Sequence, residues 1–353
     1  MKKIIFGITS LNIGGAERVL VDICNKLCEK YDITIFTIYA KGEFEKSLNK
    51  KIKLINLYNF KYENLTKMQQ NIIPLKFALM KKRIYNTYIK NKFDIEIAFL
   101  EGPITTLFSQ KNNSVKKIAW VHNDIGMVFG HNIKSMIKKI LNNNIYKQYK
   151  KIVFVSNHNK EKYLKIYKKQ KNEKLVIHNY VDKDEIIRKS NENIDLEFDN
   201  NSINFVTVSR LVKQKAIGRL IDVHYKLIEK GYKHKIYVIG DGELKEEIKE
   251  KIKKFNLEKT FILLGKKDNP YPYMKNADYF CLFSYYEGLP MVLLEAKVLG
   301  KYIVCTDTAS REALEDYNNK KIVENSEKRY IWRDEKINKK CKTKRKRKNK
   351  NRR

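Results

Sequence analysis

Long apolar runs are missing from this chain of 353 residues. No stretch approaches the ~20 apolar residues that a membrane-spanning helix needs, which excludes an integral membrane protein. The first apolar stretch lasts only about six residues before glycine and charge follow, which does not fit a signal peptide. Cysteine is equally scarce, and the five cysteines show neither metal-ligand spacing nor a disulfide framework. We therefore expect a cytoplasmic protein with reduced thiols.

Acidic residues are in short supply as well. The chain has 74 Lys and Arg residues against 40 Asp and Glu residues, which gives a formal net charge of +34. Residues 336–353 contain twelve basic residues and no acid, and the rest of the chain is basic without them. Such a surface favours anionic partners, namely nucleotides, nucleic acids or an anionic membrane face. Charge by itself does not choose among them.

Short apolar, β-rich runs alternate with helical patterns along the chain. This alternation predicts an α/β protein whose parallel sheets carry helices on both faces. The expected strands are 4–8, 33–39, 52–57, 95–100, 117–121, 152–155, 174–177, 203–208, 235–239, 260–264, 279–283 and 302–305. The expected helices are 16–30, 72–91, 133–149, 157–168, 216–230, 243–255, 290–299 and 309–316.

A polar, Asn- and Asp-rich stretch divides the chain at 183–202. We predict one doubly wound domain over residues 1–180, an interdomain segment over 181–202 and a second domain over 203–326. Residues 327–353 form a basic tail in which no fold is expected. A linker between two sheets implies a cleft, and such clefts commonly bind ligands.

A glycine pair, Gly14 and Gly15, follows the first expected strand. Glycine lets the backbone approach a ligand closely, and the free amides of a helix N-terminus attract phosphate or sugar oxygens. An ordinary strand-to-helix turn accounts for the pair equally well. His122 ends another strand, where ligands collect in doubly wound sheets, although a lone histidine is more often structural.

Two cations follow the strand at 203–208. Arg210 and Lys215 stand in the loop before a helix, where they could clamp a diphosphate. The alternative is a solvated basic loop, but Arg is rarer than Lys in this chain. The later Gly240-Asp241-Gly242 turn lacks a third glycine at position 245, so the dinucleotide-binding fingerprint fails.

Two acids frame the most informative segment. Glu287 follows a strand, and Glu295 stands eight residues later on an otherwise apolar helix. An acid in apolar surroundings needs a partner or a ligand. Gly288 and Pro290 suit the entrance of a helix, whose amides can face a phosphate. The two carboxylates could each accept hydrogen bonds from vicinal hydroxyls, one pair on a sugar and the other on a ribose.

These residues together resemble family 4 of the retaining, nucleotide-sugar-dependent glycosyltransferases, of the type that builds bacterial surface polysaccharides. The resemblance covers roughly residues 1–325 and is strongest over 204–315. It implies the GT-B fold, in which two Rossmann-like domains face a cleft. The domain over 1–180 would bind the acceptor, and the domain over 203–326 would bind the nucleotide-sugar. One departure is Ala216, which stands where the family usually has glycine.

The family implies a role for each matching position. Gly14 and Gly15 would approach the donor phosphates, and His122 would contact the donor sugar. Arg210 and Lys215 would neutralise the diphosphate. The remaining donor-binding residues would be Lys266, Glu287, Gly288, Leu289, Pro290, Met291 and Glu295, with the catalytic set expected to be His122, Arg210, Lys215 and Glu287.

The resemblance implies a hexosyltransferase that moves a sugar from a nucleotide diphosphate donor, expected to be a UDP-sugar, to a glycan or lipid-linked glycan. The nucleotide-sugar is a substrate, so no cofactor is expected. The one Asp-x-Asp triplet, at 182–184, lies in the polar interdomain stretch. Two fixed cations can neutralise the leaving diphosphate without a metal. No carboxylate nucleophile is evident on the reacting face, which favours a front-face ion-pair mechanism with retention.

The helix expected at 72–91 mixes aromatic and basic residues. We expect it to dock on an anionic membrane surface at the cytoplasmic face, near a lipid-linked acceptor. An ordinary basic surface helix fits the pattern equally well.

The match to the family fades after residue 328, where closing helices would follow. Those helices are expected to be missing or replaced. Codons for 329–338 read one base later can encode DIYGGMKKL, which resembles the family's continuation, so a frameshift is one hypothesis. Two alternative functions stay open: an inactive or truncated relative of the enzymes, and a nucleic-acid-binding protein that acts through its tail.

Overall fold

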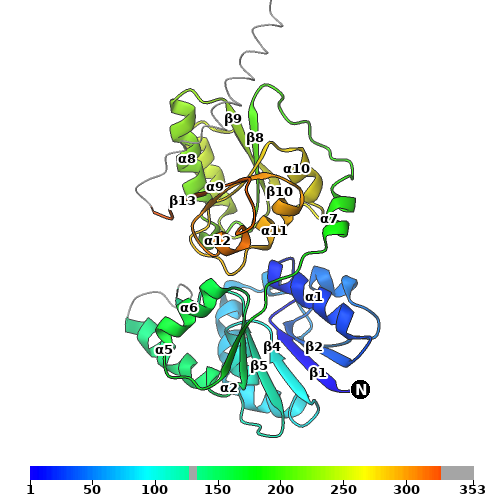
Figure 1. Cartoon of the computed structure of the whole chain (residues 1–353). Coiled ribbons are helices and arrows are strands. Elements are labelled where there is room, and N and C mark those ends of the chain that lie inside the picture. Colours follow the sequence, from blue (N-terminus) through cyan, green and yellow to red (C-terminus); the bar gives the residue numbers. More distant parts are fainter. Residues whose placement is uncertain (127–132, 327–353) are drawn as a thin grey trace, which may run out of the picture. The chain divides into compact units, whose positions relative to one another are not determined.

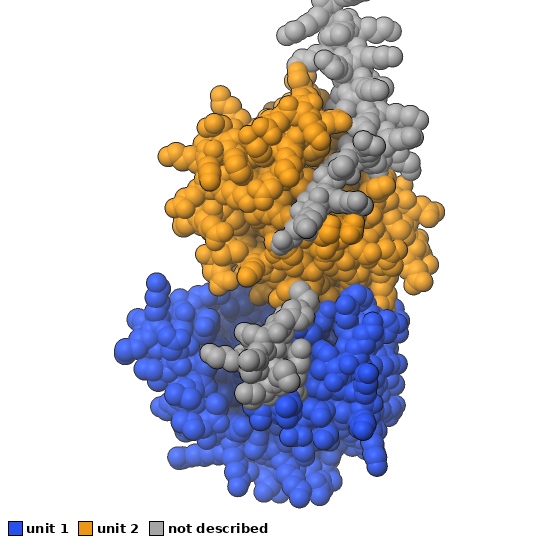
Figure 2. Space-filling model, turned by 90° about the vertical axis from the view of Figure 1, so that its left-hand side faces the viewer, with its two compact units in different colours: residues 1–180 blue, residues 181–353 orange. Residues whose placement is uncertain are grey.

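The computed structural model describes residues 1–126 and 133–326. The chain divides into two compact units, Met1–Tyr180 and Val181–Arg353, coloured separately in Figure 2. Each unit is built on one parallel β-sheet. The tail predicted at 327–353, with its missing or replaced helices, lies outside the described residues.

Unit 1 holds a seven-stranded sheet in the order β3-β2-β1-β4-β5-β6-β7. Every strand is flanked by parallel neighbours only. The seven strand positions expected from the sequence are confirmed to within two residues. The strands are β1 (Lys3–Ile8), β2 (Asp32–Tyr39), β3 (Lys53–Tyr58), β4 (Ile95–Ala98), β5 (Lys116–Val121), β6 (Lys151–Phe154) and β7 (Glu173–Val176).

The helices of unit 1 are α1 (Gly15–Leu27), α2 (Lys67–Tyr88), α3 (Pro103–Phe108), α5 (Ile133–Tyr146) and α6 (Asn157–Ile166), with short 3-10 turns η1 (Glu43–Ser47) and η2 (Tyr62–Asn64). Helix α2 begins five residues earlier than the sequence pattern predicts. Thr66 forms a capping box with Gln69, in which each residue bonds the backbone amide of the other. This cap starts the helix ahead of Pro74, which then lies inside it.

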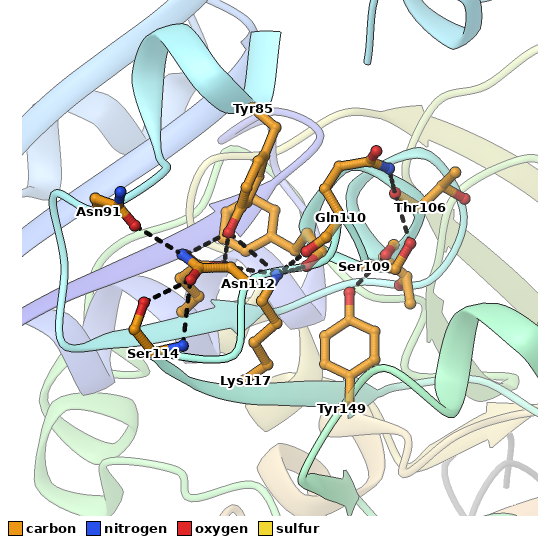
Figure 3. Close-up of polar contacts among 12 residues, drawn as sticks. Tyr85, Asn91, Thr106, Ser109, Gln110, Asn112, Ser114, Lys117 and Tyr149 are labelled. Carbon is orange, nitrogen blue, oxygen red and sulfur yellow. Dashed lines mark hydrogen bonds and ion pairs between the residues drawn. The ribbon is translucent and has the colours of Figure 1, made fainter. Parts of the chain in front are cut away.

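A buried ion pair lies inside unit 1 between adjacent strands. Lys117 on β5 stands opposite its β4 neighbour, Glu96, and its Nζ lies 3.2 Å from the Glu96 carboxylate. The Tyr85 hydroxyl of α2 donates to Glu96 at 2.8 Å, and Lys117 also donates to carbonyls at the end of α3 (Figure 3). Burial raises the pKa of Glu96 and lowers that of Lys117. The network joins two strands and two helices into one core.

Unit 2 holds a six-stranded parallel sheet in the order β10-β9-β8-β11-β12-β13. Its strands are β8 (Ile203–Val208), β9 (His234–Ile239), β10 (Phe261–Gly265), β11 (Tyr279–Leu282), β12 (Tyr302–Thr306) and β13 (Lys320–Val323). Its helices are α7 (Lys183–Lys189), η3 (Lys213–Lys215), α8 (Ile217–Glu229), α9 (Lys245–Lys254), α10 (Tyr271–Asn276), α11 (Met291–Val298) and α12 (Ser310–Ala313). Helices α8 and α9 cover one face of the sheet, and α10 and α11 cover the other (Figure 1).

The segment 181–202 is not a plain linker. Asp182 caps α7 by accepting a hydrogen bond from the Glu185 amide at 3.0 Å. Helix α7 packs against α10 and α11. The segment expected to lie between the domains therefore begins with a helix that belongs to unit 2.

Both sheets reverse their strand order at a central pair of strands. In unit 1 the reversal falls between β1 and β4, and in unit 2 between β8 and β11. The loops that leave such a pair at its carboxyl end diverge to opposite faces, which opens a crevice where ligands bind in doubly wound proteins. These two loop pairs carry most of the residues singled out from the sequence.

Candidate functional site

An ion pair joins the two loops at the reversal point of unit 2. Lys215 ends the loop that follows β8, and Glu287 lies in the loop that follows β11. The Lys215 Nζ is 2.6 Å from the Glu287 Oε1, and both side chains are largely buried. The structure thus brings together a cation and an acid that are 72 residues apart in the sequence.

Two hydrogen bonds to backbone carbonyls hold these two loops together. The Tyr285 amide donates to the Gln214 carbonyl at 2.9 Å, and the Gln214 side chain donates to the Tyr286 carbonyl at 3.0 Å. Each bond lies next to one partner of the ion pair. The positions of Lys215 and Glu287 are therefore fixed by the chain around them as well as by their charges.

Arg219 is a further residue of this region that the sequence analysis missed. It lies in the first turn of α8, it is buried, and its guanidinium donates to the carbonyls of Phe283 and Ser284. Its guanidinium carbon also lies 4.6 Å from the centre of the Tyr285 ring. Arg219 thereby supports the loop that presents Glu287. The scarcity of Arg, which drew attention to Arg210, was the available signal.

Arg210 lies in the loop after β8 and is exposed. The neighbouring glycines explain how the loop is placed. A Cβ on Gly240 would lie 1.9 Å from the Ser209 carbonyl oxygen, and one on Gly242 would lie 2.6 Å from the Leu211 carbonyl oxygen. The two glycines therefore serve a close approach of two backbone segments.

Glu295 lies in the second turn of α11 and is buried. The Tyr271 hydroxyl of α10 donates to its Oε1 at 3.2 Å. The segment Glu287–Met291 that leads into α11 is buried, and Pro290 is the residue that caps the helix. Lys266 is exposed directly after β10, at the same edge of the sheet.

In unit 1, Gly14 caps α1 and Gly15 is its first residue, so both lie where the helix amides are free. They follow β1, next to the reversal point. His122 follows β5, and its ring is 4.6 Å from the Phe99 ring centre. Burial lowers the pKa of His122 to about 3, so its imidazole is neutral at physiological pH.

The described ranges contain neither a set of three His, Cys, Asp or Glu residues placed to hold a metal ion nor a helix able to cross a bilayer. The four cysteines within them are free and buried.

Two family sequence models match consecutive parts of the chain. "Glycosyltransferase Family 4" matches residues 13–185, and "Glycosyl transferases group 1" matches residues 188–353. The chain belongs to glycosyltransferase family 4. This confirms the family expected from the two glycines, the two cations and the two acids.

Known proteins similar to this glycosyltransferase cover most of its length. An uncharacterized glycosyltransferase of Methanocaldococcus jannaschii is 28% identical over 82% of this chain and 72% of its own. A Campylobacter jejuni enzyme, N-acetylgalactosamine-N,N'-diacetylbacillosaminyl-diphospho-undecaprenol 4-alpha-N-acetylgalactosaminyltransferase, is 28% identical over 88% of this chain and 82% of its own. The crystal structure of Anabaena HepE with UDP and glucose aligns with a TM-score of 0.67 at 16% identity, over 92% of this chain and 86% of that one. These likenesses confirm the predicted GT-B fold.

The departure at Ala216 has a conformational cost that can be measured. Ala216 caps α8 with φ 50° and ψ 38°, in the left-handed region. We expect Ala216→Gly to relieve about 1–2 kcal/mol of strain, which outweighs the 0.4–1 kcal/mol or so by which glycine favours the unfolded chain. Urea denaturation should therefore show a gain in stability of up to about 1.6 kcal/mol.

Ala296→Gly, at a buried position in the interior of α11, is the matched control and should lose at least about 1 kcal/mol. If Ala216→Gly loses as much as this control, the left-handed conformation is not strained in solution.

Proposed function

We propose that the enzyme transfers a hexose-type sugar from a nucleotide diphosphate donor to a glycan acceptor, with retention of configuration and without a metal ion. The observation that carries this proposal is the Lys215–Glu287 ion pair at the reversal point of unit 2. Without a ligand, the cation and the acid neutralise each other. A donor supplies both an anion for Lys215 and hydroxyls for Glu287, so it can replace each partner of the pair.

The cations act on the leaving group. As the bond between the anomeric carbon and the phosphate oxygen breaks, negative charge develops on the nucleotide diphosphate. Lys215 and Arg210 stabilise that charge, and the backbone N–H groups of Gly288, Leu289 and Met291 before and at the start of α11 add hydrogen bonds. Positive groups already in place do not have to reorganise during the reaction, and this makes them effective catalysts.

The acids hold hydroxyls. Glu287 accepts hydrogen bonds from the donor sugar once Lys215 turns to the diphosphate. Glu295 accepts from the ribose, since a carboxylate has room for several donors beside the Tyr271 hydroxyl. Lys266 flanks the base from the end of β10.

Residues of unit 1 contact the donor near its anomeric carbon in this proposal. Gly14 and Gly15 bring backbone amides to the donor phosphates, and the neutral His122 imidazole bonds a hydroxyl of the donor sugar. The acceptor oxygen then attacks the anomeric carbon from the side that the phosphate leaves. Attack from that side preserves the configuration at the anomeric carbon, and the proton of the acceptor hydroxyl passes to the departing phosphate oxygen.

The relatives support a UDP-sugar donor and a lipid-linked acceptor. HepE was crystallised with UDP and glucose, and the name of the Campylobacter jejuni enzyme specifies a diphospho-undecaprenol-linked glycan. We extend both to this enzyme, with a place at the cytoplasmic face of the membrane and a role in bacterial surface-polysaccharide assembly.

Helix α2 supports contact with the membrane. Four of its apolar side chains are 50–78% exposed and recur every three or four residues, which places them on one face: Met68, Ile72, Leu75 and Leu79. The helix has no acidic residue but five basic ones: Lys67, Lys76, Lys81, Lys82 and Arg83. An apolar stripe among cations matches the acyl boundary of an anionic bilayer.

The catalytic assignment predicts two separate defects. Glu287→Ala should lower kcat by at least about 100-fold because the donor sugar loses its holding group. Arg210→Ala should weaken UDP binding by about 10-fold or more because a charge-assisted contact is lost. A screen of nucleotide-sugars with mass detection of products, followed by titration calorimetry with UDP, measures both.

The transfer assays contain EDTA, and transfer by the wild-type enzyme should persist because no metal ion is required. NMR of the product should show the same anomeric configuration as the donor sugar, as retention requires. Exposed Glu258 and Lys259 supply alanine controls in the same unit. Normal kinetics in both site variants would overturn the assignment, and UDP binding without turnover of any donor would indicate an inactive relative.

The membrane assignment predicts that Leu75→Glu with Leu79→Glu lowers co-sedimentation with vesicles rich in phosphatidylglycerol by more than 10-fold, because each buried leucine contributes about 1.5–3 kcal/mol. The matched control is Ile140→Glu with Leu141→Glu, two exposed apolar residues of α5. Equal losses in the two variants, or wild-type binding that ignores anionic lipid, would contradict the assignment.

A further inference from the structure

Glu101 links the carboxyl ends of two neighbouring strands in unit 1. It follows β4, and its Oε1 accepts hydrogen bonds from the backbone amides of His122 at 2.5 Å and Asn123 at 2.6 Å, just after β5. Burial raises the pKa of Glu101, and the two amide bonds act in the opposite direction because they favour the charged carboxylate. The loop that carries His122 is therefore anchored to the loop after β4, beside the reversal point of the sheet.

Polar atoms around this anchor are buried without a partner. Within the described residues, neither the second oxygen of Glu101, Oε2, nor His122 Nε2 nor Trp120 Nε1 has a hydrogen-bond partner. Each such atom costs about 1–3 kcal/mol when it stays unpaired. All three belong to residues near the carboxyl ends of β4 and β5, where the hydroxyls of a ligand would supply the missing partners.

Aromatic contacts keep the side chains of this group in place. The Phe99 ring centre lies 4.8 Å from that of Trp120, and the Trp120 and His122 rings are stacked at 6.3 Å with an interplanar angle of 17°. His122 is thus fixed through its backbone by Glu101 and through its ring by two aromatic neighbours.

We propose that Glu101 is a positioning residue for glycosyl transfer, and that with His122 and Trp120 it forms a binding site for sugar hydroxyls on unit 1. The inference rests on the proposed function. A hydroxyl both donates and accepts, so it can pair with the imidazole nitrogen, the indole N–H and the carboxylate oxygen. The hydroxyl comes from either the donor sugar or the acceptor sugar, and the experiment separates these sources.

Glu101→Ala removes the anchor and should lower turnover by at least 10-fold, while UDP affinity stays within twofold of the wild type. Glu101→Gln keeps an oxygen for the two amides and should restore most of the loss. Glu173→Ala is the matched control, because Glu173 is an exposed acid of the same unit, paired with Lys151. If hydrolysis of the donor without acceptor slows together with transfer, the hydroxyl belongs to the donor. If only the acceptor KM rises, it belongs to the acceptor.

A spectroscopic readout keeps the test independent of turnover. The imidazole nitrogen resonances of His122 are assigned by comparison with the His122→Gln variant. They should shift when UDP-sugar or acceptor glycan is added but should not shift with UDP alone. In Glu101→Ala this ligand-induced shift should be absent. Wild-type kinetics and wild-type shifts in Glu101→Ala would overturn the inference, as would a parallel loss of UDP binding. An enzyme that binds no UDP and turns over no donor contradicts the proposed function instead.

Discussion

The ion pair between Lys215 and Glu287 is the contact on which the account of this enzyme depends. Both groups are largely buried, so each would be costly to leave unpaired. Their pairing compensates both charges when no ligand is bound. A ligand that separates them must therefore supply a partner for the ammonium and a partner for the carboxylate. A pyrophosphate-linked sugar carries an anion next to hydroxyls, and it can therefore take over both halves of the pair. A simple nucleotide or a simple sugar supplies only one.

The folding of parallel strands explains why these groups meet. Residues that follow β8 and β11 come from distant parts of the chain, but the two strands are neighbours at the point where the order reverses. Neighbouring residues help to position the two loops. Gly240 and Gly242 allow the loop of Arg210 to pack closely, and Arg219 holds the carbonyls before Glu287. In unit 1 the same geometry places Gly15, Glu101 and His122 after three adjacent strands.

The sequence predicted the strands and the family well because both depend on local signals. A strand is visible in the sequence as an apolar run between polar turns. The family motif is visible as two acids eight residues apart, Glu287 and Glu295. Strand β13 was missed because its four residues include two lysines, Lys320 and Lys321. Arg219 and Glu101 were missed for another reason: each acts through backbone groups of a distant segment, and backbone partners leave no trace in side-chain spacing. The role of α7 was also hidden, since packing alone decides to which unit a polar helix belongs.

The most direct test of the central claim is a crystal structure of the enzyme with a non-hydrolysable nucleotide-sugar, which offers both the diphosphate and the sugar hydroxyls. The account predicts diphosphate oxygens within hydrogen-bond distance of the Lys215 ammonium and the Arg210 guanidinium, with the 2.6 Å contact between Lys215 and Glu287 opened. A diphosphate bound away from both cations, with that contact unchanged, would contradict it.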